Sequence, residues 1–167
     1  MKTVFNTFAM TCIFTFAIGM LAQTFAQSYK SETELIQDVW GMEKQEIIKE
    51  YMELNELEAQ AFWPIYEEYA EKRKKIGAEK IDIIMEYAAN YTNMADKKAA
   101  DITNGIFKNN MKLEKLQKKY YGKLAKVIAP VRATEFMQLE KYLDNAMSYE
   151  LQNNIPFLKE VDKLKDS

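Results

Sequence analysis

Few side chains in this sequence can do acid–base, nucleophilic or metal chemistry. The chain has no histidine and a single cysteine, Cys12. It therefore lacks the commonest general base and metal ligand, and a di-iron bundle, which needs Glu-x-x-His on two helices, is excluded. The sequence contains no Gly-rich phosphate loop, nucleophile elbow or calcium loop. We predict no catalytic, cofactor-binding or metal-binding residue and no enzyme activity.

The methionines after residue 26 allow three interpretations. They fill an ordinary core, or they form an adaptable apolar surface for varied partner chains, because thioethers repack easily. They could also bind copper(I), which favours soft thioether ligands, although no tight cluster occurs. These residues are Met42, Met52, Met85, Met94, Met111, Met137 and Met147.

The densest aromatic stretch is Phe62-Trp63-Pro64-Ile65-Tyr66-Glu67-Glu68-Tyr69. Its aromatic residues exceed what one helix face can bury, and Trp63 lies off the common face. Trp63 either packs against a neighbouring helix or contacts a partner chain, since Trp and Tyr supply large contact areas at low entropy cost. The candidate partner-binding residues are Phe62, Trp63, Ile65, Tyr66 and Tyr69.

Residues 1–26 have the pattern of a secretory signal peptide. Lys2 is their only charge, an apolar run extends over residues 8–21, and Thr24-Phe25-Ala26 provides a small-x-small exit. The run is shorter than the roughly 20 residues that span a bilayer. We predict cleavage after Ala26, which removes Cys12, and export to the periplasm without stable membrane insertion afterwards. Residues 27–41 are predicted to be a flexible N-terminal segment.

From Leu35 onward, apolar residues recur at helical spacing. A short helix is predicted over 42–52. Leu54, Asn55 and Glu58 then form a helix-capping motif for a long helix that contains Pro64 near its start. Asn93 is predicted to cap a second long helix, which continues to Ala129-Pro130 and ends or kinks there. Pro130 could also be the first residue of a last helix, which breaks at residues 153–156.

The short links predict an all-α fold: an elongated antiparallel helical hairpin or bundle of about four helices, two of them long. Residues 42–156 form the single domain and 157–167 a C-terminal tail. An apolar stripe without an intramolecular partner favours a homodimer or an open binding surface. The formal net charge of −2 gives no reason to expect a nucleic-acid partner.

The signal peptide, the helix order and the segment Leu54-Asn55-Glu56-Leu57-Glu58 resemble the Spy/CpxP superfamily of periplasmic proteins, which is marked by paired LTxxQ motifs at helix starts. Ile128-Ala129-Pro130-Val131-Arg132 occupies the place of the second motif. The sequence is still more similar to uncharacterised exported Bacteroidetes proteins with an FWPxY block like residues 62–66. The resemblance implies a helical hairpin that dimerises and acts as an ATP-independent chaperone, a stress-signalling inhibitor or a metal sensor.

The leading hypothesis is a periplasmic, ATP-independent chaperone-like or stress-response protein that holds unfolded or partner chains on an apolar helical face. The alternative is a regulatory or sensor adaptor with one dedicated envelope partner. A periplasmic metal sensor or buffer that uses carboxylates and methionines is a third hypothesis, and the absence of histidine counts against it.

Overall fold

The computed structural model describes residues 41–153 and Leu158, with the side chains of the last helix described to Tyr149. The predicted signal peptide 1–26, the segment 27–41 apart from Gly41, and the tail 157–167 apart from Leu158 lie outside the described residues. All the described residues belong to one compact unit.

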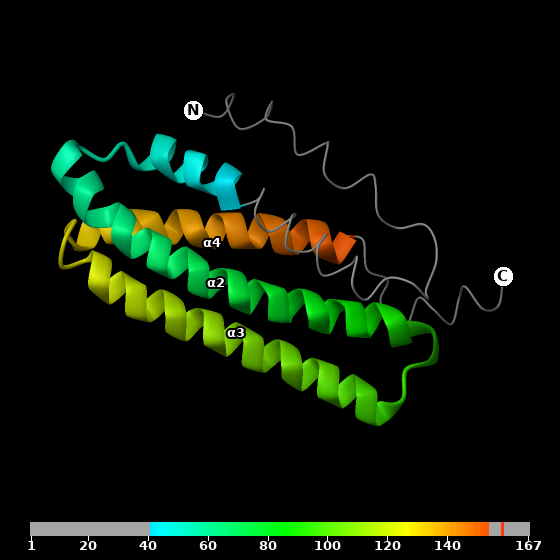
Figure 1. The fold of residues 1–167 in the computed structure, drawn as a ribbon. Coiled ribbons are helices and arrows are strands. Elements are labelled where there is room, and N and C mark those ends of the chain that lie inside the picture. The colour runs from blue at the N-terminus through cyan, green and yellow to red at the C-terminus, as the bar shows by residue number, and fades with distance from the viewer. Residues whose placement is uncertain (1–40, 154–157, 159–167) are drawn as a thin grey trace. The chain divides into compact units, whose positions relative to one another are not determined.

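The described part of the chain is all-helical, and residues 41–153 contain no strand (Figure 1). The predicted fold class, about four helices of which two are long, is confirmed at this level. Within the described residues, the first helix covers residues 41–52 and so includes the predicted range 42–52. It is followed by α2 (Glu56–Asn90), the 3-10 turn η1 (Tyr91–Asn93), α3 (Asp96–Leu124) and α4 (Pro130–Asn153).

The helix α2 begins at the predicted capping motif. The Asn55 side-chain oxygen accepts a hydrogen bond from the Glu58 backbone N–H at 3.0 Å, and the Asn55 backbone N–H donates to the Glu58 carboxylate at 3.2 Å. Each bond satisfies a donor that helix geometry leaves without a partner. Leu54, just before the cap, packs against the core and fixes where the chain enters the helix.

Replacing Asn55 with alanine is expected to lower the free energy of unfolding by about 1 kcal/mol, because the first turn of α2 loses its acceptor. Urea denaturation followed by circular dichroism measures the change. Asn55→Ser keeps an acceptor and should restore most of the loss. An alanine variant as stable as the wild type would contradict the role of the cap.

Pro64 lies inside α2 and bends it. Proline has no backbone N–H, so the Gln60 carbonyl loses its helical hydrogen bond at this point. Figure 1 shows the first turns of α2 at an angle to the rest of the helix, as expected for a proline kink.

The predicted cap of the second long helix is wrong. Asn93 lies inside η1, and α3 begins after Ala95, which has an extended backbone and no side-chain cap. The chain leaves the 3-10 turn through Met94 and Ala95, both extended, so the helix starts too far along for Asn93 to act as its cap. Asp96 does lie in the first turn, where the helix dipole favours a carboxylate.

The regular helix α3 ends at Leu124, earlier than the predicted end at Ala129-Pro130. The backbone N–H groups of Val127 and Ile128 both bond to the Leu124 carbonyl at 2.9 Å, and the turn that they form buries Ile128 in the core. Ala129 follows with φ of 70°, a left-handed conformation, and Pro130 opens α4 as its first residue. The second of the two positions predicted for Pro130 is therefore the observed one.

Contacts between α2 and α3 occur at several positions along both helices. The two helices lie close together at Gly105, where a Cβ would be in van der Waals contact with the Ile83 Cδ1 atom at 3.4 Å. The pairs in contact are Glu68 with Lys123, Tyr69 with Tyr120, Ile76 with Asn109, Glu79 with Lys112, and Glu86 with Lys98.

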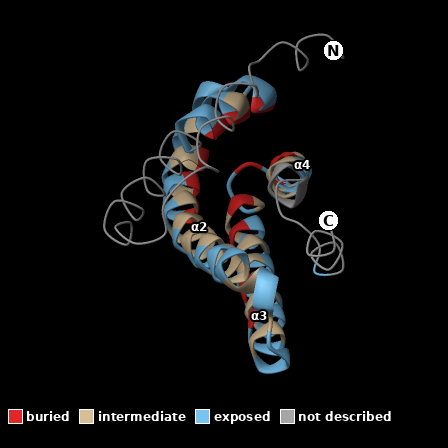
Figure 2. Cartoon of the chain, turned by 90° about the vertical axis from the view of Figure 1, so that its right-hand side faces the viewer, coloured by how far each residue is buried: buried red, intermediate tan, exposed pale blue. Residues whose placement is uncertain are grey.

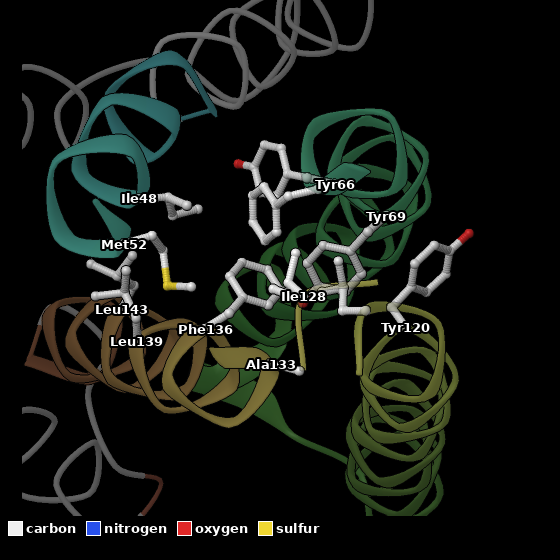
Figure 3. Close-up of a cluster of buried hydrophobic side chains, with 12 residues drawn as sticks. Ile48, Met52, Tyr66, Tyr69, Tyr120, Ile128, Ala133, Phe136, Leu139 and Leu143 are labelled. Atoms are coloured by element: carbon white, nitrogen blue, oxygen red, sulfur yellow. The ribbon is translucent and has the colours of Figure 1, made fainter. Parts of the chain in front are cut away.

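The core lies where the helix 41–52, α2, α3 and α4 come together (Figure 3). Figure 2 shows that buried residues are concentrated there, whereas the far half of the α2 and α3 pair is mainly half-buried or exposed. In that far half only Ile102 and Asn109 are buried. The core is formed by Ile48, Met52, Phe62, Tyr66, Tyr69, Tyr120, Leu124, Ile128, Ala133, Phe136, Leu139 and Leu143.

Candidate functional site

The predicted partner-binding residues divide into two groups. Phe62, Tyr66 and Tyr69 are buried in the core, whereas Trp63 and Ile65 are half-buried and pack against it. A buried side chain cannot meet a partner unless the helices separate. The structure therefore leaves Trp63 and Ile65 as the members of this set that a partner could reach directly.

The aromatic rings of this block tie α2 to its neighbours. The Phe62 ring meets the Phe136 ring of α4 edge-on at 5.2 Å, and the Tyr69 ring lies 5.4 Å from the Tyr120 ring of α3. Trp63 makes edge-on contacts with Phe62 at 5.1 Å and with Tyr66 at 5.4 Å. Such pairs add to the free energy gained by burial. The block is therefore the centre of the fold.

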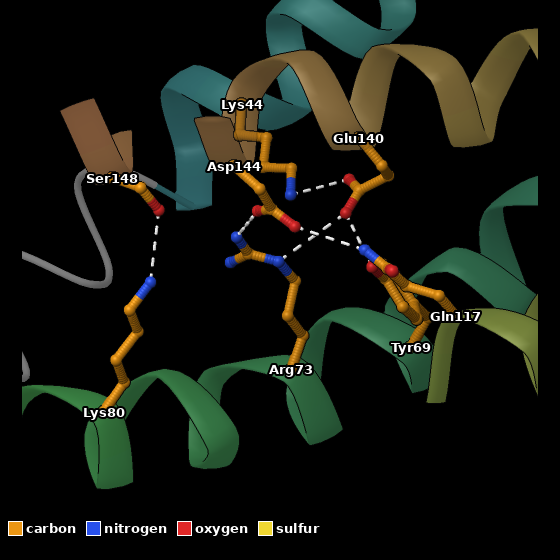
Figure 4. A network of polar contacts seen from close by, with 8 residues as sticks. All are labelled: Lys44, Tyr69, Arg73, Lys80, Gln117, Glu140, Asp144 and Ser148. Atoms are coloured by element: carbon orange, nitrogen blue, oxygen red, sulfur yellow. Dashed lines mark hydrogen bonds and ion pairs between the residues drawn. The ribbon is translucent and has the colours of Figure 1, made fainter. Parts of the chain in front are cut away.

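A cluster of polar side chains, which the sequence did not lead us to predict, lies beside these rings (Figure 4). The Glu140 carboxylate is fully buried; it accepts a hydrogen bond from the Tyr69 hydroxyl at 2.6 Å and pairs with the Lys44 ammonium at 2.6 Å. Arg73 pairs with Asp144, and its Nε lies 3.6 Å from Glu140. Two cations thus oppose two carboxylates in the core.

The cluster connects all four helices through hydrogen bonds and ion pairs. Lys44 comes from the helix 41–52, Tyr69 and Arg73 from α2, and the two carboxylates from α4. Gln117 of α3 donates to Asp144 at 3.2 Å. Further along, Lys80 of α2 donates to the Ser148 hydroxyl of α4 at 3.1 Å. The side chains of α2 supply donors and those of α4 supply acceptors, so the cluster fixes the register of these two helices.

Burial and charge shift the titration of these groups in different directions. Burial lowers the pKa of Lys44, because desolvation disfavours the ammonium more than Glu140 favours it. Burial also opposes the charge of Arg73, but Asp144 and Glu140 outweigh it and raise the pKa. Burial and the nearby Glu140 charge raise the pKa of both Tyr69 and Tyr66. These tyrosines stay protonated donors in the folded protein.

The free energy of unfolding is expected to fall as the pH rises above 10. Unfolded tyrosine ionises near pH 10.0, whereas Tyr66 and Tyr69 keep their protons when folded, so the folded state binds more protons there. Each contributes a loss of up to about 1.4 kcal/mol per pH unit. Lys44 acts oppositely, since its lowered pKa makes stability rise with pH until the unfolded lysine titrates near 10.5.

Urea denaturation between pH 9 and 11.5 measures this dependence. In the Tyr66→Phe variant, the free energy of unfolding is expected to fall less steeply with pH above 10, because one of the two tyrosines that keep their protons in the folded state is gone. Stability that stays constant from pH 10.5 to 11.5 in the wild type would contradict the burial of the two hydroxyl groups.

The sequence does contain a pattern that could have predicted the polar cluster: charged residues spaced four positions from buried apolar residues. Arg73 stands four residues after Tyr69 and Glu140 four residues after Phe136, which are positions on the apolar faces of α2 and α4. Lys44 stands four residues before the buried Ile48 in the same way. A charged residue at a core position in each of three helices indicates mutual pairing, because an isolated buried charge is costly.

Several apolar side chains on one side of α3 are exposed. Phe107 is 60% exposed and Met111 is 50% exposed, and they are one helical turn apart. Tyr121 lies on the same side of the helix and is 37% exposed. An open cavity of about 260 Å³ continues this surface toward α4 and is lined by Gln117, Lys118, Tyr121, Thr134 and Met137.

Lysines flank these apolar side chains. Within the described residues, Lys108, Lys115 and Lys118 form no ion pair, in contrast to Lys112 and Lys123, which pair with glutamates of α2. The face formed by Phe107, Met111, Tyr121, Lys108, Lys115 and Lys118 is called the α3 face below. The lysines of α3 are Lys97, Lys98, Lys108, Lys112, Lys115, Lys118, Lys119 and Lys123, and its acidic residues are Asp96, Asp101 and Glu114.

Neither a metal site nor a membrane span is found in the part of the chain that the structure describes. Those residues contain no group of three or more Cys, Asp or Glu side chains placed to hold an ion. Within the same residues, no helix has the length and apolarity that a bilayer crossing requires.

Comparison with protein-family models, curated proteins and solved structures gave no match to this chain.

Proposed function

We propose that this protein is an exported, ATP-independent chaperone-like protein that holds unfolded or partner chains on the α3 face. The observation that carries the proposal is the exposure of Phe107 and Met111 beside lysines that form no ion pair within the described residues. Adjacent exposed apolar side chains with a polar rim support an interaction surface here. The lysines keep the face soluble and add attraction for acidic segments of a client.

The chemistry of the face suits varied clients better than one fixed ligand. Met111 is flexible and polarizable, so it can pack against differently shaped side chains. Phe107 and Tyr121 supply large contact areas with few rotatable bonds. A helix surface without a deep pocket can accept an extended or helical segment of any sequence that offers apolar residues.

The proposal includes the architecture that the resemblance to the Spy/CpxP superfamily implies. We infer that α2 and α3 form an antiparallel hairpin, which the pairing of Glu68 with Lys123 and of Glu86 with Lys98 supports. We also infer that the mature chain forms a homodimer, which brings two α3 faces together and doubles the area offered to a client. Light scattering of the mature protein tests the dimer.

An aggregation assay tests the function. The mature protein at near-equal ratio should slow the light scattering of a chemically denatured client, without ATP. The variant Phe107→Ser/Met111→Ser should lose most of this effect and keep its helical circular dichroism. The matched control is Leu57→Ser/Val131→Ser, which removes two side chains that are at least as exposed but lie elsewhere. Equal activity of both variants would sink the assignment to the α3 face.

Crosslinking in the cell envelope distinguishes a chaperone-like function from an adaptor role. A chaperone-like protein yields many crosslinked clients, and their number drops in the Phe107→Ser/Met111→Ser variant. One dominant partner, with no effect on aggregation, would show that the protein is instead a dedicated adaptor.

A further inference from the structure

The helix 41–52 covers a surface of α2 and α4 through a single stripe of side chains. Lys44, Ile48 and Met52 are buried and follow one another at intervals of four residues. Figure 3 shows Ile48 and Met52 directed toward Tyr66, Phe136, Leu139 and Leu143. The surface that these four residues form with Glu140 is called the covered surface below.

The covered surface selects for charge as well as shape. Glu140 is fully buried, and the helix 41–52 supplies the Lys44 ammonium that lies 2.6 Å from its carboxylate. Without that helix, the surface would present the Glu140 carboxylate beside apolar side chains, with Arg73 and Asp144 of the polar cluster next to it. A helix with a cation four residues before an aliphatic residue, and eight before a second apolar residue, has the complementary pattern.

Three observations indicate that the helix 41–52 is weakly held. The part of it that the structure describes spans about three turns, and an isolated helix of that length is marginal in water. A cavity of about 510 Å³ lies beside it, lined in part by Met42, Lys44 and Gln45 of this helix and by Tyr66 and Arg73 of α2. The link to α2 contains Glu53 at φ 42°, a left-handed conformation that a non-glycine residue rarely adopts.

We propose that the covered surface is a binding site for an amphipathic helix of a partner protein that carries one cation on its buried face, with the helix 41–52 as the resident occupant. The partner helix carries Lys or Arg at the position of Lys44 and apolar residues at those of Ile48 and Met52. The resident helix leaves when the partner binds and returns when it dissociates. This site goes beyond the α3 face and shares none of its residues.

Binding of a labelled peptide with the sequence of residues 41–53 tests the proposal. In fluorescence anisotropy, the full mature chain should bind this peptide weakly, because its own helix competes. The chain variant Lys44→Ser/Ile48→Ser loosens the resident helix, so its affinity for the peptide should rise by about tenfold or more. Lys49→Ser, an exposed position on the same helix, is the matched control and should leave the affinity unchanged.

Charge reversal tests the role of Glu140. A peptide with Lys44→Glu should bind the loosened chain at least about tenfold more weakly. Adding Glu140→Lys to that chain should favour the reversed peptide over the original one. A loosened chain that keeps its helical circular dichroism but gains no affinity for the original peptide would overturn the proposal.

Hydrogen exchange on the unaltered mature chain provides a test that no substitution can disturb. Backbone amides of residues 44–52 should exchange at least about 100-fold faster than those of α2 around Tyr69, through local opening. Equal protection of both segments would mean that the helix 41–52 leaves only when the whole protein unfolds, and the proposal would fail. The Phe107→Ser/Met111→Ser variant should keep peptide binding, so failure here is distinguishable from failure of the chaperone-like function.

Discussion

Replacing Arg73 with methionine is expected to lower the free energy of unfolding by about 3–5 kcal/mol. The guanidinium pairs with Asp144 and lies 3.6 Å from Glu140, and both carboxylates are largely buried. The substitution keeps the volume of the side chain but leaves two negative charges facing one buried ammonium. Urea denaturation at pH 7 measures the loss.

The control for this prediction is Lys97→Met, which removes a cation from an exposed pair with Asp101. Exposed pairs contribute little, so its stability should hardly change. The double variant Arg73→Met/Asp144→Met should recover part of the loss, because an apolar pair replaces an unpaired charge. If Arg73→Met and Lys97→Met have equal effects, the buried cluster does not stabilise the fold in the way described.

Replacing Phe62 with alanine is expected to destabilise the protein by about 3–5 kcal/mol, whereas Trp63→Ala should cost only about 1–2 kcal/mol. The Phe62 side chain is fully buried between Trp63, Tyr66 and Phe136, so its removal leaves a cavity that these rings cannot fill. The Trp63 side chain is half-buried and loses contact on one side only. Thermal unfolding followed by circular dichroism gives both values.

Substitutions at Phe62 and Trp63 should also differ in their effect on partner binding. If Trp63 contributes to a partner contact, Trp63→Ala should reduce crosslinking in the cell envelope more than Phe62→Leu, which keeps a large apolar side chain in the core. Equal losses of stability at Phe62 and Trp63 would show that both rings belong to the core and would remove Trp63 from the candidate partner contacts.

Local sequence patterns predicted the helices well and their junctions less well. Asn55 and Glu58 form the expected capping box because that motif depends only on residues within one helical turn. Asn93 failed as a cap because the path between α2 and α3 depends on how the two helices pack, which one-dimensional spacing does not contain. The early end of α3 has the same origin, since the turn before Ala129 serves to bury Ile128.

The candidate sites were harder to predict than the helices. Aromatic density at residues 62–69 looks the same in sequence whether the rings face a partner or the core, and Phe136, one of the rings that bury Phe62, comes from α4. The pairing of Lys44 with Glu140 joins residues far apart in the chain. On the α3 face, only the packed structure shows that Phe107 and Met111 are exposed.

The order of the contacts along the chain has a consequence for how the molecule folds. Lys98 meets Glu86 only 12 residues away, and Lys112 meets Glu79 and Lys123 meets Glu68 at separations of 33 and 55. The contacts between α2 and α3 can therefore form one after another, beginning next to the η1 turn. Each new contact closes only a short additional loop, so little chain entropy is lost at each step. Tyr69 and Glu140 are 71 residues apart, and Arg132 and the Met52 carbonyl that it binds are 80 apart. We therefore expect the ion pairs that Glu140 forms with Lys44 and Arg73 to close late in folding, so that substitutions in them speed unfolding and leave the folding rate nearly unchanged.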